Sequence, residues 1–263
     1  MLTRSKSALI MRWFIHFAIT AFLLAWPAST SVADEQIQTD ANLVTALDVS
    51  DSIMRHEEWL EVEGLAKAVV SAAVLDAIAG GQHGRIGFAV ITWSSGGRFE
   101  IIVPWTLIDS IDNAEGVAAA LRGFAIDRSS WQPRANGSGG SDKFPEHQTD
   151  ISRAIDFAAS LALAAPSISQ RPVVNICANG TDNVGEDPRA ARDRALAAGI
   201  VVNGLVIGGK NGLTGYLREH VQGGAGSFVM QVTQPAALAA AMIDKLLRDL
   251  IADTPAPAAV PFT

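Results

Sequence analysis

The sequence predicts a doubly wound α/β fold, with helices on both faces of a mostly parallel central sheet and one antiparallel edge strand. Short, continuously apolar runs alternate along the chain with longer amphipathic patterns, which is typical of buried parallel strands connected by helices. Two of these runs, 85–93 and 99–103, are separated by the turn sequence Ser-Ser-Gly-Gly, and this arrangement indicates a hairpin. The hairpin supplies the antiparallel edge strand.

The first strand, 43–48, is an apolar run that stops at Asp48. The first helix covers 57–79, because apolar side chains recur there at three- and four-residue spacing until two glycines end the pattern. After the hairpin, a second helix covers 113–124 and has Asp112 as its N-cap. The remaining elements alternate in the order helix 151–165, strand 172–177, helix 188–198, strand 200–207, helix 213–221, strand 227–232 and helix 236–251.

The two ends of the chain are not expected to belong to this domain, which spans 34–251. Residues 1–33 have the layout of a secretory signal peptide, with a basic leader, an apolar stretch at 13–26 and small residues before the expected cleavage site. A retained membrane anchor is the alternative, although the stretch is shorter than the roughly 20 residues that span a bilayer. Residues 252–263 are rich in Pro and Ala and are expected to be disordered. These features predict a periplasmic or secreted bacterial protein without a membrane span after cleavage.

Charge and cysteine content narrow the expected partners. The formal charge of the chain is −7, and removal of the three basic side chains in 1–33 takes it to −10. Such a surface repels nucleic acid and anionic membranes. Cys177 is the single cysteine and lies in an apolar run, so we expect a buried, unpaired thiol. Export without a disulfide fits the bacterial periplasm or secretion.

Asp48, Ser50 and Ser52 follow one another at alternate positions where the chain leaves the first strand. A loop can curl alternate side chains around one point, and all three offer hard oxygen donors of the kind that Mg²⁺ prefers. In doubly wound sheets, ligands bind outside the carboxyl ends of the strands where the strand order reverses. The alternative is that these residues only cap the helix that follows.

Two further polar loops are expected at the same edge of the sheet. One contains Thr149 just before a helix, and the other follows a strand and reads Asn179-Gly180-Thr181-Asp182. A loop insertion at 127–148, rich in Gly, Ser, Pro and charge, enters the fold just before Thr149. Loops of this length are often functional or disordered. We therefore expect the insertion beside the metal face, either contacting a partner or simply solvated.

Asp48-x-Ser50-x-Ser52 is followed by Thr149 before a helix and, after the next strand, by Asn179-Gly180 at the position of the family's acidic-Gly pair. This pattern resembles the metal-ion-dependent adhesion site of von Willebrand factor A domains. The resemblance covers roughly residues 40–250 in the expected order of elements. Four short segments further resemble an exported bacterial branch of that superfamily whose function is not established, namely 84–87, 93–94, 103–106 and 198–200.

The resemblance implies one divalent cation, usually Mg²⁺, at the top of the sheet. Ser50, Ser52 and Thr149 would be direct ligands, and Asp48 would act through water. A carboxylate from a partner protein would fill the open coordination position, so the cation would bridge two negative surfaces without any chemical reaction. The resemblance thus implies a binding module and not an enzyme.

One position departs from the family pattern, because Asn179 stands where an Asp is usual. The neutral amide removes one negative charge, so affinity for Mg²⁺ or Mn²⁺ should fall. Asp182 could compensate if the loop is rearranged, as could Asp51 or Asp150. The alternative is a degenerate site, in which the fold serves only as a structural or interaction domain.

An enzyme is the competing function class. The sequence contains no Gly-x-Ser-x-Gly nucleophile elbow, no phosphate-binding loop and no His-Glu-x-x-His zinc motif. A metal-dependent hydrolase using Asp48 and Asp182 would need a general base, and none of the five histidines is an evident candidate. The sequence therefore favours an exported module that binds a protein partner.

Overall fold

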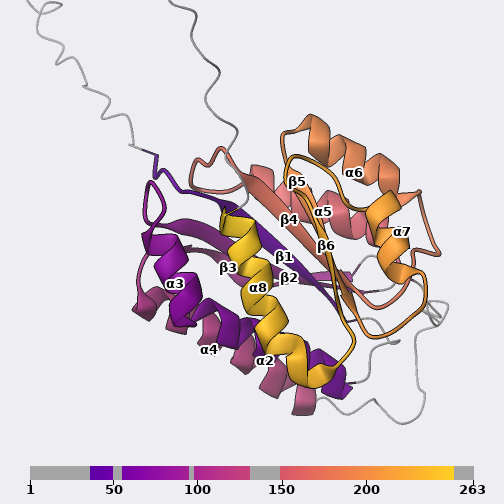
Figure 1. Cartoon of the computed structure of the whole chain (residues 1–263), viewed down its shortest axis with the longest axis horizontal. Coiled ribbons are helices and arrows are strands. Elements are labelled where there is room, and N and C mark those ends of the chain that lie inside the picture. Colours follow the sequence, from indigo (N-terminus) through magenta and orange to yellow (C-terminus); the bar gives the residue numbers. More distant parts are fainter. Residues whose placement is uncertain (1–35, 50–54, 95–97, 131–148, 252–263) are drawn as a thin grey trace, which may run out of the picture. The chain divides into compact units, whose positions relative to one another are not determined.

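The computed structural model describes residues 36–49, 55–94, 98–130 and 149–251. The expected signal peptide, the tail 252–263, Ser50, Ser52 and most of the 127–148 insertion lie outside these residues. One central sheet organises the described part (Figure 1). Its six strands are β1 (Asn42–Asp48), β2 (Ile86–Ser94), β3 (Arg98–Ile108), β4 (Pro172–Ala178), β5 (Val201–Ile207) and β6 (Val229–Val232).

The strands are ordered β3-β2-β1-β4-β5-β6. All neighbouring strands are parallel except the antiparallel pair β2 and β3, so β3 is the antiparallel edge strand. The chain first builds outward from β1 to β2 and β3, then returns to the other side of β1 to form β4. The strand order therefore reverses between β1 and β4, and the predicted doubly wound fold is confirmed.

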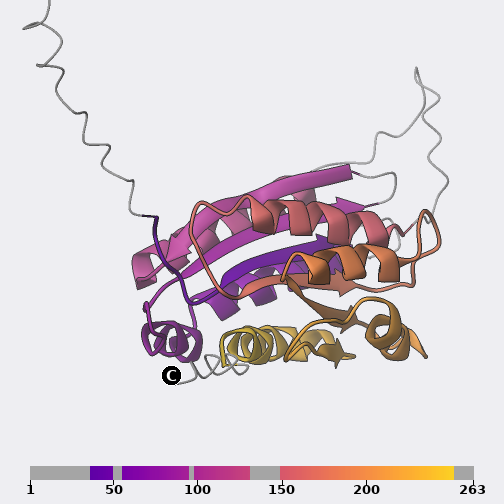
Figure 2. The ribbon, with the colours of Figure 1, turned by 90° about the horizontal axis from the view of Figure 1, so that it is seen from above.

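Helices cover both faces of this sheet. One face carries α2 (Arg55–Val69), α3 (Ala72–Ala79), α4 (Ile111–Ser130) and α8 (Leu238–Ile251), the last of which follows the short 3₁₀ helix η3 (Pro235–Ala237). The other face carries α5 (Ile151–Leu163), α6 (Pro188–Ala197) and α7 (Leu213–His220). Figure 2 shows the same arrangement from a perpendicular direction.

Alternate residues of each central strand enter the two halves of the core. Leu43 and Leu47 of β1 pack toward α2 and α8, whereas Val44 and Ala46 pack toward α5. This alternation follows from the two-residue period of a strand, and burial of both faces explains why the strand is apolar throughout. Cys177 of β4 is buried and unpaired, as predicted.

Two predicted helices differ from the observed ones. The single helix predicted at 57–79 is two helices, because Ser71 starts a new one: its hydroxyl accepts a hydrogen bond from the Val74 N–H (3.4 Å) and donates one to the Ala68 carbonyl (2.8 Å). The helix predicted at 113–124 runs from Ile111 to Ser130, and the Ser110 hydroxyl, not Asp112, accepts from the backbone of its first turn. The 127–148 insertion accordingly begins with the last turn of α4.

The second strand of the hairpin is longer than predicted. It was expected to end at 103, before Pro104, but β3 continues to Ile108. Proline lacks an N–H and is tolerated in an edge strand, where half of the backbone groups have no ladder partner. The register of β2 and β3 shifts on both sides of Val90, close to the proline position.

A tight approach between β2 and β1 leads to a stability prediction at Gly87. A Cβ there would collide with the Asn42 side-chain oxygen. That oxygen accepts hydrogen bonds from the hydroxyls of Thr39 and Ser167 (both 2.9 Å), and the Asn42 amide donates to the Ser167 carbonyl (2.9 Å). Gly87→Ala should displace Asn42 from this network and lower the free energy of unfolding by about 2 kcal/mol, measured by urea denaturation.

Gly116→Ala is the matched control. Gly116 is exposed on α4, and a Cβ there would meet nothing within 4 Å. Since alanine stabilises an exposed helix relative to glycine, this change should raise the free energy of unfolding by about 0.5–1 kcal/mol. Equal stability of Gly87→Ala and the wild type would contradict the proposed role of the Asn42 network.

Candidate metal site

The candidate site lies where β1 and β4 end, next to the reversal of strand order. Asp48 is the last residue of β1 and is fully buried. Its neighbour Val49 donates a backbone hydrogen bond to the Trp93 carbonyl on β2 (2.9 Å), which fixes the path of the chain as it leaves the sheet. Asp48 therefore stands at the predicted ligand crevice. Ser50 and Ser52 lie outside the described residues, so their part in the site stays a prediction.

Thr149 and the loop after β4 are joined by two reciprocal hydrogen bonds. The Thr149 N–H donates to the Asn183 side-chain oxygen (2.8 Å), and the Asn183 N–H donates to the Thr149 carbonyl (3.1 Å). The Thr149 hydroxyl also faces Gly180, since a Cβ built there would lie 3.7 Å from it. Thr149 and Asn179 are both buried. The structure thus brings the segment before α5 against the loop after β4, the strand that pairs with β1.

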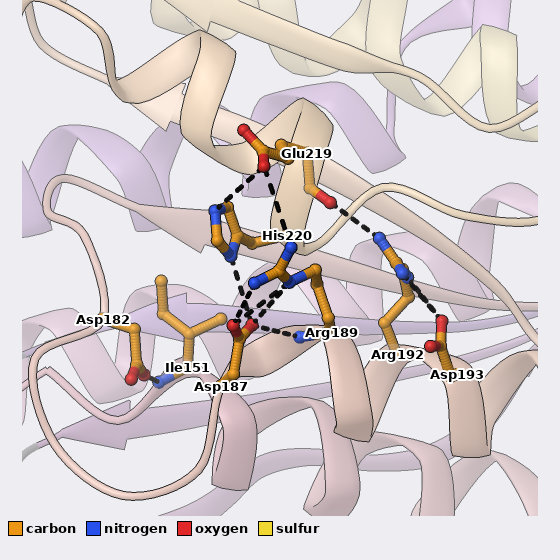
Figure 3. Close-up of polar contacts among 8 residues, drawn as sticks. All are labelled: Ile151, Asp182, Asp187, Arg189, Arg192, Asp193, Glu219 and His220. Atoms are coloured by element: carbon orange, nitrogen blue, oxygen red, sulfur yellow. Dashed lines mark hydrogen bonds and ion pairs between the residues drawn. The ribbon is translucent and has the colours of Figure 1, made fainter.

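Asp182 and Asp150 hold the N-terminus of α5. The Ile151 N–H donates to Asp182 Oδ1 at 2.5 Å (Figure 3), and Asp150 caps the helix by accepting from the Arg153 N–H (3.1 Å) and the Ser152 hydroxyl (2.8 Å). Burial raises the pKa of Asp182 to about 6; the Ile151 N–H opposes this rise and the Asp150 charge adds to it. Negative charge at a helix N-terminus is stabilised by the helix dipole. One oxygen of Asp182 therefore has a structural partner, which the sequence did not reveal.

The donor set determines which cations the site fits. Asp48, Thr149 and Asn179 offer a carboxylate, a hydroxyl and an amide carbonyl, all hard oxygens that suit Mg²⁺ or Mn²⁺. No group of three or more His, Cys, Asp or Glu side chains within the described residues is placed to hold a metal ion. A hard cation bound partly through hydroxyl and amide oxygens is therefore compatible with these residues, whereas a thiolate or imidazole site is not built from the described part of the chain.

Glu61 is a buried acid that the sequence analysis did not single out. It lies on α2, is 1% exposed, and its Oε1 has no hydrogen-bond partner in the described structure. Burial raises its pKa well above the usual range, and the charges of Asp48 and Glu58 raise it further, while the Cys177 thiol donates a hydrogen bond that opposes the rise. The available signal was a glutamate inside the apolar stripe of the 57–79 pattern. Glu61 keeps one ionisable group inside the core close to the candidate site.

A second group of charged residues joins α6 to α7 at the surface (Figure 3). Asp187 caps α6 through the Arg189 N–H (2.9 Å), pairs with the Arg189 guanidinium (2.7 Å) and contacts His220 Nδ1 (3.1 Å). Arg192 donates to the Glu219 carbonyl (2.7 Å). Hydrogen bonds from Arg189 hold the pKa of Asp187 well below its usual range. These hydrogen bonds and ion pairs connect the two helices at the surface.

A family model described as a protein of unknown function, DUF1194, matches residues 38–254. The chain belongs to this family. The described residues have the von Willebrand factor A-like fold that the sequence resemblance implied. No match is found among curated proteins.

Solved structures confirm the fold of this DUF1194 chain. Proximal thread matrix protein 1 from the mussel byssus is 17% identical with a TM-score of 0.53, covering 82% of this chain and 49% of the mussel protein. The pilus adhesin SpaC from Lactobacillus rhamnosus GG is 11% identical with a TM-score of 0.54, covering 82% and 31%. The vWF domain of the pilus tip protein Mfa5 from Porphyromonas gingivalis is 10% identical with a TM-score of 0.51, covering 80% and 95%. The chain thus spans half or less of the first two proteins, and at these identities the likeness establishes the fold alone.

No helix in the described residues combines the length and apolar character needed to cross a bilayer.

Proposed function

We propose that this DUF1194 chain is an exported, non-enzymatic binding module that recognises an acidic residue of a partner protein through a divalent cation. The observation that carries the proposal is the meeting of the Thr149 hydroxyl with the Asn179-Gly180 turn, at the sheet edge where Asp48 ends β1. Support also comes from the fold, which the chain shares with a pilus adhesin and a pilus tip domain. Periplasmic or secreted localisation is part of the proposal.

The residues have distinct proposed roles. Thr149, together with Ser50 and Ser52, would offer hydroxyl oxygens directly to Mg²⁺ or Mn²⁺. The buried Asp48 carboxylate, acting through water, would offset part of the positive charge of the cation. Asn179 would contribute an amide oxygen, and Asp182 a carboxylate oxygen. A bound cation supplies positive charge that a partner's carboxylate can meet, because Mg²⁺ keeps its waters until an oxygen anion displaces them.

One feature favours this proposal over a metal-dependent hydrolase. Asp150 and Asp182, two of the described carboxylates beside the site, accept backbone hydrogen bonds at the start of α5, which positions them for helix capping. An interaction domain with a degenerate metal site remains the alternative, and metal affinity distinguishes it.

Calorimetry with Mg²⁺ and Mn²⁺ on the mature chain tests the proposal. Thr149→Ala and Ser50→Ala should each weaken binding by at least roughly tenfold, because each removes a ligand oxygen. Asn179→Asp should strengthen binding by roughly tenfold, because a carboxylate replaces a neutral amide. A tenfold gain in affinity corresponds to about 1.4 kcal/mol of binding free energy.

Thr106→Ala is the control for the threonine change. Its hydroxyl donates to the Pro104 carbonyl on the edge strand β3 (2.9 Å), away from the candidate site, so metal affinity should not change. If neither the wild type nor Asn179→Asp binds a divalent cation, the metal-dependent function is wrong and the degenerate site is correct.

A further inference from the structure

The loop after β5 carries a lysine whose backbone is fixed. The Gly208 N–H donates to the Val232 carbonyl (2.8 Å), and the Lys210 carbonyl accepts from the Leu213 N–H (3.4 Å) at the start of α7. Gly208 and Gly212 have φ values of 91° and 82°, a left-handed conformation that glycine adopts without strain. The loop is therefore held at both ends, and Lys210 extends from it as an exposed side chain.

The ammonium group of Lys210 reaches the candidate metal site. A Cβ built on Gly180 would lie 3.7 Å from Lys210 Nζ and 3.7 Å from Thr149 Oγ1. The ammonium and the hydroxyl thus border the same small space above Gly180, and they are no farther apart than these two distances together. Within the described ranges, no carboxylate forms an ion pair with Lys210. Its positive charge therefore borders the same space as the hydroxyl that is proposed to hold a divalent cation.

We propose that the Lys210 ammonium supplies a permanent positive charge next to Gly180. This charge weakens the binding of a divalent cation, and the ammonium itself pairs with the carboxylate of the partner. This inference rests on the proposed function, because it presupposes that an acidic partner binds here. The charge balance supports it. Asn179 lacks the negative charge that would favour a divalent ion, while Lys210 adds a positive charge that repels one and attracts a carboxylate.

Titration of Mn²⁺, followed by the electron paramagnetic resonance signal of the free ion, tests the first half of the inference. Lys210→Met keeps an unbranched side chain that is one atom shorter and removes the charge, so Mn²⁺ affinity should rise by roughly tenfold, the effect expected of one positive charge on a divalent ion several ångströms away in a solvated site. Combination with Asn179→Asp should raise affinity further. Unchanged or lower affinity in Lys210→Met would overturn the inference, even if Thr149→Ala still weakens binding as the proposed function requires.

Lys67→Met is the matched control. Lys67 is exposed in the last turn of α2 and pairs with Glu63 (3.6 Å) on the same helix, far along α2 from the site. The change in net charge is the same as in Lys210→Met, so a general electrostatic effect would appear in both variants. Equal gains in Mn²⁺ affinity for the two variants would contradict a local role for Lys210.

A triglutamate peptide, added to ¹⁵N-labelled protein in the presence of a chelator, tests the second half. At low ionic strength, the amide signals of Lys210 and Thr149 should shift in a saturable way as peptide is added. Lys210→Met should lower the affinity for the peptide by at least threefold, whereas Lys67→Met should leave it unchanged. Absence of Mn²⁺ binding in every variant would refute the proposed metal function, and the peptide result would then decide the inference by itself. Peptide affinity equal in wild type and Lys210→Met would overturn it.

Discussion

Asp249→Asn should lower the free energy of unfolding by about 3 kcal/mol or more, the largest loss expected from any single polar substitution in this chain. Asp249 and Lys245 form an ion pair (3.2 Å) one turn apart on α8, and both side chains are buried, at 0% and 2% exposure. Removal of the carboxylate charge leaves an ammonium inside the core without compensation. Such a charge is costly because it loses hydration and no opposite charge takes the place of the carboxylate.

The ion pair belongs to a hydrogen-bonded network that connects α8 to two strands. Asp249 accepts from the side-chain amides of Asn175 on β4 (2.8 Å) and Asn203 on β5 (2.9 Å). Lys245 donates to the Asn175 oxygen and lies 5.1 Å from the Phe228 ring centroid, and the Phe228 N–H donates to the Asn203 oxygen (2.9 Å). Nearly every polar atom of the group has a partner, so loss of one member affects the others.

Urea denaturation of Asp249→Asn and of Asp244→Asn measures the effect against a matched control. Asp244 forms an ion pair with Arg248 (3.0 Å) at the same spacing on the same helix, but both side chains are about half exposed. Solvent screens such a pair, so the control should lose about 0.5 kcal/mol or less. Addition of Lys245→Met to Asp249→Asn should recover part of the loss, because it removes the buried charge. Equal losses for the two aspartates would contradict the buried-charge argument.

Glu61→Gln should stabilise the protein at pH 8, by on the order of 2 kcal/mol. Burial raises the pKa of Glu61 well above its usual range, and the charge of Asp48 raises it further. The glutamine amide keeps the shape of the side chain, and its oxygen can still accept from the Cys177 thiol. It carries no charge at any pH, so the folded chain no longer has to hold a buried proton or a buried carboxylate.

The pH dependence of this effect has a definite sign. Because the pKa of Glu61 is higher in the folded state than in the unfolded state, the folded state binds the proton more tightly. The stability that Glu61 contributes is therefore fully present below its unfolded pKa of about 4.5 and is lost as pH rises toward the folded pKa. The advantage of Glu61→Gln should accordingly vanish near pH 4 and grow with increasing pH.

Glu63→Gln on the same helix is the control with the opposite expectation. The Glu63 carboxylate pairs with Arg122 (3.0 Å) and Lys67 (3.6 Å), so its removal should cost a few tenths of a kcal/mol at pH 8. Urea denaturation between pH 4 and pH 8 compares the two variants. A Glu61→Gln variant that is less stable than the wild type at pH 8 would show that the carboxylate has a stabilising partner.

The fold was predictable because its signals are local. Each central strand is buried on both faces, and the apolar runs of β1, β4 and β5 reveal this within seven residues. The wrong boundaries of the predicted helix 57–79 and of the predicted strand 99–103 also have local causes. The apolar period of 57–79 continues through Ser71, so the period alone cannot show that this hydroxyl starts a second helix. Similarly, Pro104 reads as the end of a strand unless that strand is known to be at the sheet edge.

The candidate site was predictable to the extent that it depends on strand order. A doubly wound sheet places the residues after β1 and β4 at one edge, so Asp48, Thr149 and Asn179 could be assigned to a common region. The identity of the metal ligands stays a prediction. The structure adds that one oxygen of Asp182 holds the Ile151 N–H, a contact between residues 31 positions apart for which the sequence has no signal.

Which polar side chains from distant segments contact one another depends on tertiary packing. Lys245 and Asp249 read in the sequence as an ordinary surface pair on an amphipathic helix, and Asn175 and Asn203 as isolated polar residues in two apolar strands. Only the docking of α8 against β4 and β5 makes them one buried network. Local periodicity and turn residues act over about ten positions and therefore specify elements and their order. Which side-chain atoms meet depends on the register and packing of segments far apart in the chain, and the position of the Lys210 ammonium beside Thr149 follows from the same cause.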